Sequence, residues 1–252
     1  MEDYREQVRT EIVDIFRNKI KGRREPIRQP GDPDGAIGHW LETQFGLTAN
    51  GYNAPDFKGF ELKKDTRDKT TFGDWSADRY LFSTGVGACS RDDFLEIFGS
   101  PNPDGRFSWS GSCFPKVGFT NSFGQRIHVT NDGNVVATYD YAQDSRQNKD
   151  QIVPLAFRNG LIPLAYWTAE NLRRKVEDKF NVFGWFSVRK NNQGFYDAIV
   201  FGDPIDFNFW ISQVREGTIY LDSGMYQGNP RPYQNWRASN TLWDSLIVAV
   251  MS

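Results

Sequence analysis

The sequence predicts a mixed α/β protein, with helices flanking a sheet of the α+β kind. Two stretches, residues 4–20 and 168–180, carry apolar residues four apart, as on the buried side of a helix. Strand-like apolar runs come in two pairs, each joined by a polar turn that favours a hairpin: 126–130 with 135–141 across NDG, and 182–189 with 195–201 across KNNQG. No internal repeat interrupts this pattern.

Composition narrows the class of protein. A chain of 252 residues with 38% hydrophobic content is long enough for one large domain or two lobes around a cleft. No apolar run reaches the roughly 18 residues of a membrane span, and the charged N-terminus is unlike a secretory signal. Cys89 and Cys113 are expected to be free thiols. We therefore expect a cytoplasmic protein with no membrane partner.

The first expected helix spans residues 4–20, with Val8, Ile12, Phe16 and Ile20 on its apolar side. It leads into the densest basic run of the chain, which includes Lys19, Lys21, Arg23, Arg24 and Arg28. Such a run is usually a solvated surface, but it also suits a phosphate backbone. The net charge of −2 neither requires nor excludes a nucleic-acid partner.

A second expected helix carries Ile37, Leu41 and Phe45 at helical spacing and ends at Gly46. Glu42 lies next to its apolar face and is a candidate to present a carboxylate to the strand that follows. His39, one turn earlier, is either a substrate contact or a packed or capping histidine.

The stretch APDFKGFELKK, residues 54–64, holds the main candidate site. If residues 60–64 form a strand, Glu61 and Lys63 point the same way while Phe60 and Leu62 face the core. Together with Asp56, they suit a hard divalent cation and metal-assisted phosphodiester hydrolysis. The alternative is an exposed strand edge that carries charged side chains. The spacing of Asp56, Glu61 and Lys63 alone does not exclude it, because the same spacing occurs by chance in about one chain of this length in ten.

The middle of the chain is less informative. We expect residues 70–72 to begin a loop into a strand near 80–83, followed by a short helix at 91–98. Residues 99–124, rich in Gly, Pro and Ser, predict a long irregular excursion. Within it, Trp109 serves either base stacking or core packing.

The last third predicts a helix at 207–215, a strand at 218–222, a polar loop, and a final strand at 242–250. Side chains of the loop have groups able to read base edges: Gln227, Asn229, Arg231, Gln234, Asn235, Arg237 and Asn240. An ordinary surface loop is the alternative.

Two motifs together resemble the MvaI/BcnI group of restriction endonucleases and, more distantly, the MutH mismatch-repair nickase. The helix motif GxxGxxLE is formed here by Gly35, Gly38, Leu41 and Glu42. The strand motif is formed by Asp56, Gly59, Glu61, Leu62 and Lys63. The likeness is clearest over residues 35–64, with a looser one from about 208 onward. There the family pattern often bears histidine, whereas this chain has Trp236 and Arg237.

The resemblance implies a PD-(D/E)xK restriction-endonuclease-like fold. Its catalytic lobe would be centred on about residues 1–90 with part of the middle sheet, and its recognition lobe would include about 203–245. Asp56, Glu61 and the Leu62 carbonyl would bind Mg²⁺, Lys63 would orient the attacking water, and Glu42 would support the site.

The family also implies a monomer that clamps double-stranded DNA and cuts each strand in turn. A cognate DNA methyltransferase would act on the same site without having to bind the protein. On this interpretation the expected DNA contacts are Arg23, Arg24, His39, Arg231, Asn235, Arg237 and Asn240.

We therefore expect a Mg²⁺-dependent Type II restriction endonuclease. A MutH-like nickase recruited by repair partners and a non-catalytic DNA-binding module remain alternatives. With only His39 and His128, the chain lacks the histidines of an HNH or zinc site. It also has no P-loop, GxSxG elbow or dinucleotide fingerprint.

Overall fold

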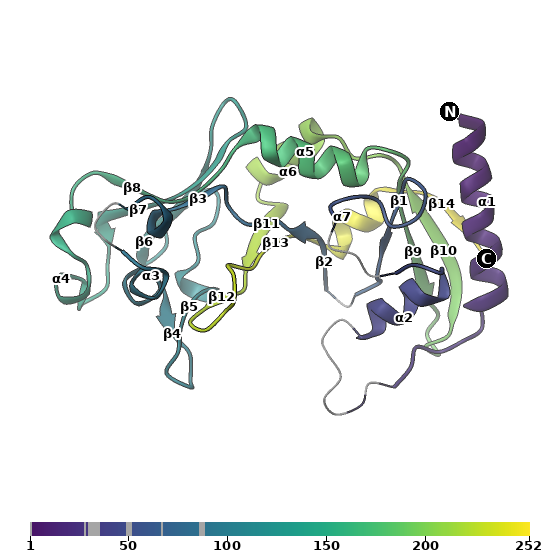
Figure 1. The fold of residues 1–252 in the computed structure, drawn as a ribbon, viewed down its shortest axis with the longest axis horizontal. Helices are drawn as coiled ribbons and strands as arrows, with labels where there is room; N and C mark the ends of the chain where they lie inside the picture. Colours follow the sequence, from purple (N-terminus) through teal and green to yellow (C-terminus); the bar gives the residue numbers. More distant parts are fainter. Residues whose placement is uncertain (1, 28, 30–35, 49–51, 67, 86–88) are drawn as a thin grey trace. The chain divides into compact units, whose positions relative to one another are not determined.

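A computed structural model describes residues 2–27, 29, 36–48, 52–66, 68–85 and 89–252, which form two compact units (Figure 1). Unit 1 comprises Met1–Thr70, Lys175–Asp206 and Ser239–Ser252, and unit 2 comprises Thr71–Arg174 and Phe207–Ala238. Both contain helices and sheets, so the predicted mixed α/β class is confirmed. Arg28 and Gly35 lie outside the described residues.

Unit 1 is built on a four-stranded sheet of order β1-β9-β10-β14, in which β1 and β9 are parallel and the other neighbours antiparallel. Its elements are α1 (Glu2–Lys19), α2 (Ala36–Gln44), β1 (Phe60–Lys63), β9 (Gly184–Lys190), β10 (Tyr196–Gly202), α7 (Asn240–Ser245) and β14 (Ile247–Met251). Three further elements cross the boundary with unit 2: β2 (Lys69–Asp74), α5 (Ala169–Phe180) and β13 (Gln234–Ser239).

Different helices cover the two faces of this sheet. On one face, apolar residues of α1 and α2, including Ile12, Phe16 and Leu41, share a core with Phe60 and Leu62 of β1. This arrangement confirms the predicted opening helices.

The opposite face holds Trp185, whose ring lies 5.0 Å from that of Trp243 in α7. Phe180, at the end of α5, packs 6.1 Å from the same ring. Helix α7 and the last turn of α5 therefore cover the face of the sheet to which Glu61 and Lys63 point.

Unit 2 contains three sheets, of order β11-β13-β2, β12-β5-β4 and β3-β8-β7-β6. Its remaining elements are β3 (Arg79–Tyr80), η1 (Leu81–Ser83), α3 (Arg91–Phe98), β4 (Ser100–Pro101), β5 (Phe107–Trp109), η3 (Gly111–Cys113), β6 (Phe123–Val129), β7 (Val135–Asp144), α4 (Lys149–Ile152), η4 (Leu155–Phe157), β8 (Leu161–Trp167), α6 (Phe207–Arg215), β11 (Ile219–Ser223) and β12 (Met225–Tyr226). The predicted hairpin across NDG is confirmed as β6 and β7.

Several expectations about these segments were wrong. Thr70–Phe72 belongs to strand β2, whose partner β13 lies far along the chain and cannot be recognised from local sequence signals. The stretch at 99–124 is irregular over most of its length, as expected, but it contains the short strands β4 and β5. Trp109 is fully buried there, which leaves core packing as its role. Part of the expected loop after β11 is strand β13, and the expected final strand at 242–250 divides into helix α7 and strand β14.

Strand β8 was not anticipated, because Pro163 interrupts its apolar run and cannot donate to a ladder. The β7–β8 register shifts between Ala137 and Thr138, and Pro163 lies opposite Thr138. The proline is thus accommodated at a bulge.

Among the helices of the described residues, none is long and apolar enough to cross a membrane.

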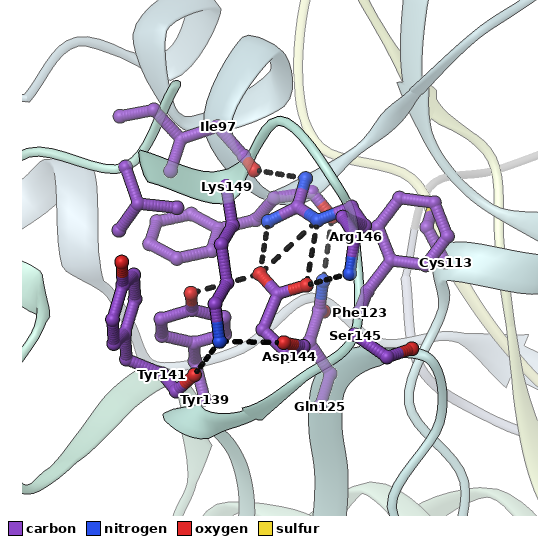
Figure 2. A network of polar contacts seen from close by, with 12 residues as sticks. Ile97, Cys113, Phe123, Gln125, Tyr139, Tyr141, Asp144, Ser145, Arg146 and Lys149 are labelled. Atoms are coloured by element: carbon purple, nitrogen blue, oxygen red, sulfur yellow. Dashed lines mark hydrogen bonds and ion pairs between the residues drawn. The ribbon is translucent and has the colours of Figure 1, made fainter. Parts of the chain in front are cut away.

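A buried ion pair closes the end of β7 (Figure 2). The Asp144 carboxylate is fully buried and accepts from Arg146 Nη2 at 2.6 Å and from the Tyr139 hydroxyl at 2.9 Å. Arg146 also donates to the Ile97 carbonyl. Burial would raise the pKa of Asp144, but the hydrogen bonds from Arg146 and Tyr139 outweigh it and hold the pKa below its ordinary value.

We expect Asp144→Ala to lower the free energy of unfolding by about 3–5 kcal/mol, because it leaves a buried guanidinium unpaired. Asp104→Ala is a matched control: Asp104 and Arg106 have the same spacing and the same 2.6 Å contact, but about half of each side chain is exposed. It should cost about 0–1 kcal/mol. Urea denaturation measures both.

The stabilisation from Asp144 also has a defined pH dependence. The pKa of Asp144 is lower in the folded protein than in the unfolded chain, where it is about 4. The stabilisation is therefore present above about pH 4 and is lost as the pH falls through the folded-state pKa. The gap between wild type and Asp144→Ala should therefore persist at pH 7 and shrink below about pH 4. A gap that is constant down to pH 2, or equal losses in both variants, would contradict this account.

Candidate active site

Strand β1 places two residues of the expected motif side by side. Lys63 Nζ lies 2.7 Å from Glu61 Oε1. Phe60 and Leu62 point the other way, into the core with α1 and α2. The alternation expected from the sequence is confirmed, and it brings a carboxylate and an ammonium together inside the protein.

A tight turn precedes β1. Phe57 and Phe60 exchange two backbone hydrogen bonds of 2.8 Å around Lys58 and Gly59. Both central residues have positive φ, 45° and 102°, as in turns that join antiparallel strands. The turn reverses the chain, so the residue before Phe57 lies beside β1.

That residue, Asp56, lies along the open edge of the strand. Its Oδ2 accepts a hydrogen bond of 3.0 Å from the Leu62 backbone N–H. The N–H and C=O of one strand residue point to the same side, so the Leu62 carbonyl faces this edge too. Because β1 is an edge strand of the described sheet, no other strand of that sheet pairs with this carbonyl, which lies on the same edge as the Asp56 carboxylate.

Glu61 is a buried carboxylate held by two ammonium groups. Its side chain is 3% exposed, and Oε1 contacts Lys63 Nζ at 2.7 Å and Lys179 Nζ at 3.1 Å. Burial raises the pKa of Glu61 to about 6. The positive charges of the two lysines lower this pKa, and the negative charge of Asp56 raises it. Burial likewise lowers the pKa of Lys63, against the pull of Glu61.

The second oxygen of Glu61 fits a metal ligand. Oε2 is buried and has no hydrogen-bond partner in the part of the chain that the structure describes. Within the same residues, no group of three His, Cys, Asp or Glu side chains could hold a metal ion. Mg²⁺, however, is commonly held by one or two carboxylates and keeps several waters. Asp56, Glu61 and the Leu62 carbonyl match that pattern.

The structure does not gather Glu42 into a three-carboxylate group with Asp56 and Glu61. Glu42 lies on α2 with its side chain 34% exposed, and its Oε2 is 3.1 Å from Nδ1 of His39. His39 is itself 60% exposed. Leu41 and Phe45, by contrast, are buried in the core of unit 1, so they fix the helix.

The basic segment after α1 is partly tied to the sheet of unit 1. Residues 22–24 run beside the start of β10, with the Arg23 carbonyl accepting from the Tyr196 N–H at 2.9 Å. The Arg24 guanidinium lies 4.4 Å from the Phe195 ring. The side chains of Arg23 and Arg24 are both on an exposed stretch of chain.

Two of the expected base-reading arginines already have carboxylate partners. Arg231 contacts Asp74 at 2.5 Å, and Arg237 contacts Asp222 at 3.0 Å. Asn235 and Arg237 share the half-buried face of β13, opposite to the buried face that holds Trp236.

Asn240 lies elsewhere, at the start of α7. Its amide donates to the Thr66 carbonyl at 2.5 Å, and its Oδ1 accepts from the Thr70 hydroxyl at 3.3 Å. These contacts give Asn240 a structural role in unit 1. Its expected contact with DNA stays a prediction.

Residues 24–251 match the family model described as LlaMI restriction endonuclease. The chain belongs to the LlaMI restriction endonuclease family. It is 44% identical to the Type II restriction enzyme ScrFI of Lactococcus lactis subsp. cremoris over 259 residues, which covers 94% of this chain and 96% of that relative. This LlaMI-family protein is therefore a Type II restriction enzyme, a site-specific deoxyribonuclease.

A solved structure of MvaI has a fold similar to that of this chain. The complex of restriction endonuclease MvaI with its cognate DNA substrate matches with a TM-score of 0.64, covering 100% of this chain and 98% of that one. At 13% identity the likeness concerns the fold alone.

One residue of this LlaMI-family site was missed by the sequence motifs. Lys179 reaches Glu61 from α5, far along the chain from β1. The available signal was its position: Lys179 follows Leu172 by seven residues and Val176 by three, which places it on the apolar side of the helix. A lysine on a buried stripe needs a partner, and here the partner is Glu61.

The turn before β1 yields a test in this LlaMI-family enzyme. A Cβ at Gly59 would lie 2.4 Å from the Phe183 ring, whereas one at Gly194, also at positive φ, would meet nothing within 4 Å. Gly59→Ala should cost about 1–3 kcal/mol more than Gly194→Ala in urea denaturation, because the packed ring must move. It should also slow DNA cleavage, since the turn positions Asp56. Equal stability and equal cleavage in the two variants would contradict the role of the turn.

Proposed function

We propose that this restriction enzyme hydrolyses one phosphodiester bond in each strand of double-stranded DNA, using Mg²⁺ held by Asp56 and Glu61. One observation carries the proposal. Buried Glu61 has one oxygen held by two ammonium groups, while its other oxygen has no partner in the described structure. Leaving a buried acceptor unsatisfied costs about 1–3 kcal/mol, so this oxygen is best explained as a ligand atom.

Bound Mg²⁺ would lower the pKa of a coordinated water and neutralise charge on the scissile phosphate. Asp56 and Glu61 supply the carboxylate ligands, and the Leu62 carbonyl supplies a third oxygen from the strand edge. Lys63 donates a hydrogen bond that orients the attacking water.

In this proposal unit 1 is the catalytic lobe of a PD-(D/E)xK fold, because it contains strand β1 with Glu61 and Lys63. Unit 2 is the recognition lobe, to which β11 and β13 of the stretch at about 203–245 belong. Asn235 and Arg237, together on one face of β13, would read adenine and guanine edges. That MvaI was solved with its cognate DNA substrate supports a DNA partner.

The remaining contacts and partners are proposed as follows. Arg23, Arg24 and His39 would contact the DNA backbone, and Arg231 would exchange its carboxylate partner for DNA. The enzyme would act as a monomer. A cognate methyltransferase would modify the same sequence independently.

The proposal is tested by incubating the protein with plasmid DNA and Mg²⁺. Wild type should give discrete double-strand fragments, and chelation of the metal should abolish them. Asp56→Ala should bind DNA without cutting, and Lys63→Ala should cut at least about 10²-fold more slowly, because each removes a group that acts on the reacting phosphate. Arg5→Ala, which removes an arginine of α1 paired with Asp203, is the control and should cut normally.

Wild-type cleavage by either active-site variant would overturn the mechanism. Nicked circles alone, without double-strand fragments, would overturn the proposal of cleavage in both strands.

The basic segment gives a separate prediction. Replacing Arg23 and Arg24 together by Ala should weaken DNA binding and flatten its salt dependence, by about one unit in the slope of log K against log salt for each phosphate that is no longer neutralised. The control replaces Arg5 and Arg17, which have partners within unit 1, and removes the same net charge. Fluorescence anisotropy over a salt series measures both. An unchanged slope, or equal flattening in the control, would remove Arg23 and Arg24 from the interface.

A further inference from the structure

Lys179 is a second lysine at the carboxylate of β1 that does not belong to the expected motif. Its Nζ lies 3.1 Å from Glu61 Oε1, the same oxygen that Lys63 contacts at 2.7 Å. The Lys179 side chain is 18% exposed, so the contact is shielded from solvent. A surface ion pair formed by chance would be far more accessible.

The helix that carries Lys179 is firmly held at this end. Phe180 is fully buried, and its carbonyl accepts from the Ile205 N–H at 3.2 Å. The Lys175 carbonyl accepts from the Asn53 side chain at 2.9 Å. The last turn of α5 therefore delivers Lys179 from a rigid element, as a precisely oriented active-site group requires.

Lys63 is also in contact with this turn. Its Nζ lies 4.9 Å from the centroid of the Phe180 ring. The consecutive residues Lys179 and Phe180 thus contact Glu61 and Lys63, the two members of the buried pair. The end of α5 is part of the environment of both groups.

The two ammonium groups on Oε1 have unequal tasks in a hydrolysis reaction. If Lys63 alone held Glu61, its movement toward a water would leave a buried, charged oxygen unpaired, which is strongly unfavourable. With Lys179 in place, Oε1 keeps a cationic partner throughout. Oε2, which has no hydrogen-bond partner within the described residues, is left for another ligand.

We propose that Lys179 is a positioning residue that acts through Glu61. It fixes Oε1, so that Oε2 is presented to the metal and Lys63 is released to orient water. This inference rests on the proposed function of Glu61 as a metal ligand. It assigns a role in the reaction to a helix outside the motif of β1.

The first experiment compares cleavage and DNA affinity in three variants. Lys179→Met should lower kcat about 10–100-fold, as is typical when a group that orients a ligand is removed, with little change in KM or in DNA affinity without metal. Lys179→Arg keeps the charge and should stay within a few fold of wild type. Lys175→Met, one turn earlier on α5, is the control and should cut normally.

A second experiment needs no cleavage. Urea denaturation of the metal-free protein should show that Lys63→Met and Lys179→Met together destabilise more than the sum of the single changes, because only the double variant leaves Glu61 without a cation. In a Glu61→Gln background this excess should disappear. If Lys179→Met does not fold, Lys179→Gln takes its place in both experiments.

The inference is overturned if the uncharged variant cuts at the wild-type rate, or if the two lysine changes are simply additive. It is also overturned if kcat is unaffected and DNA affinity falls, which would make Lys179 a DNA contact. Failure of the proposed function is distinguishable, because in that case wild type itself would not cut DNA with Mg²⁺.

Discussion

The structure of unit 1 depends on the burial of a negative charge in the middle of its edge strand. All four residues of β1 are buried, and one of them is Glu61. A lone carboxylate at such a position would take up a proton or unfold the strand. Two lysines prevent this, one from the same strand and one from α5. With Asp56, they form a group of two acids and two ammoniums whose formal charges cancel before any ion enters.

Much of this site follows from local sequence rules. The alternation of a strand places Glu61 beside Lys63, and helical spacing identifies the apolar sides of α1 and α2. These patterns are local, so a single sequence is enough to recognise them. The turn at Lys58 and Gly59 is local too, although the sequence alone did not show that it would bring Asp56 onto the edge of β1.

The parts that could not be predicted depend on partners far apart in the chain. Strand β2 finds its neighbour β13 more than 150 residues later, so its threonines looked like turn residues. Asn240 bonds to Thr66 and Thr70, which lie about 170 residues earlier, so no local signal could show these contacts. Lys179 is the same kind of case: the sequence motifs gave it no role, because its partner Glu61 lies on a strand far away in the chain. For long polar side chains, the identity of the residue is a weaker guide than the face on which it lies.

The order of strands in unit 1 has a consequence for how the enzyme is made. Strand β1 is synthesised early, but the other strands of its sheet, β9, β10 and β14, follow only after more than a hundred further residues. The ribosome has therefore produced both segments of unit 2 before residues 247–251 complete the sheet that carries Glu61. The contacts of Glu61 with Lys63 and Lys179 therefore gain their complete supporting sheet only after every residue of unit 2 has been synthesised.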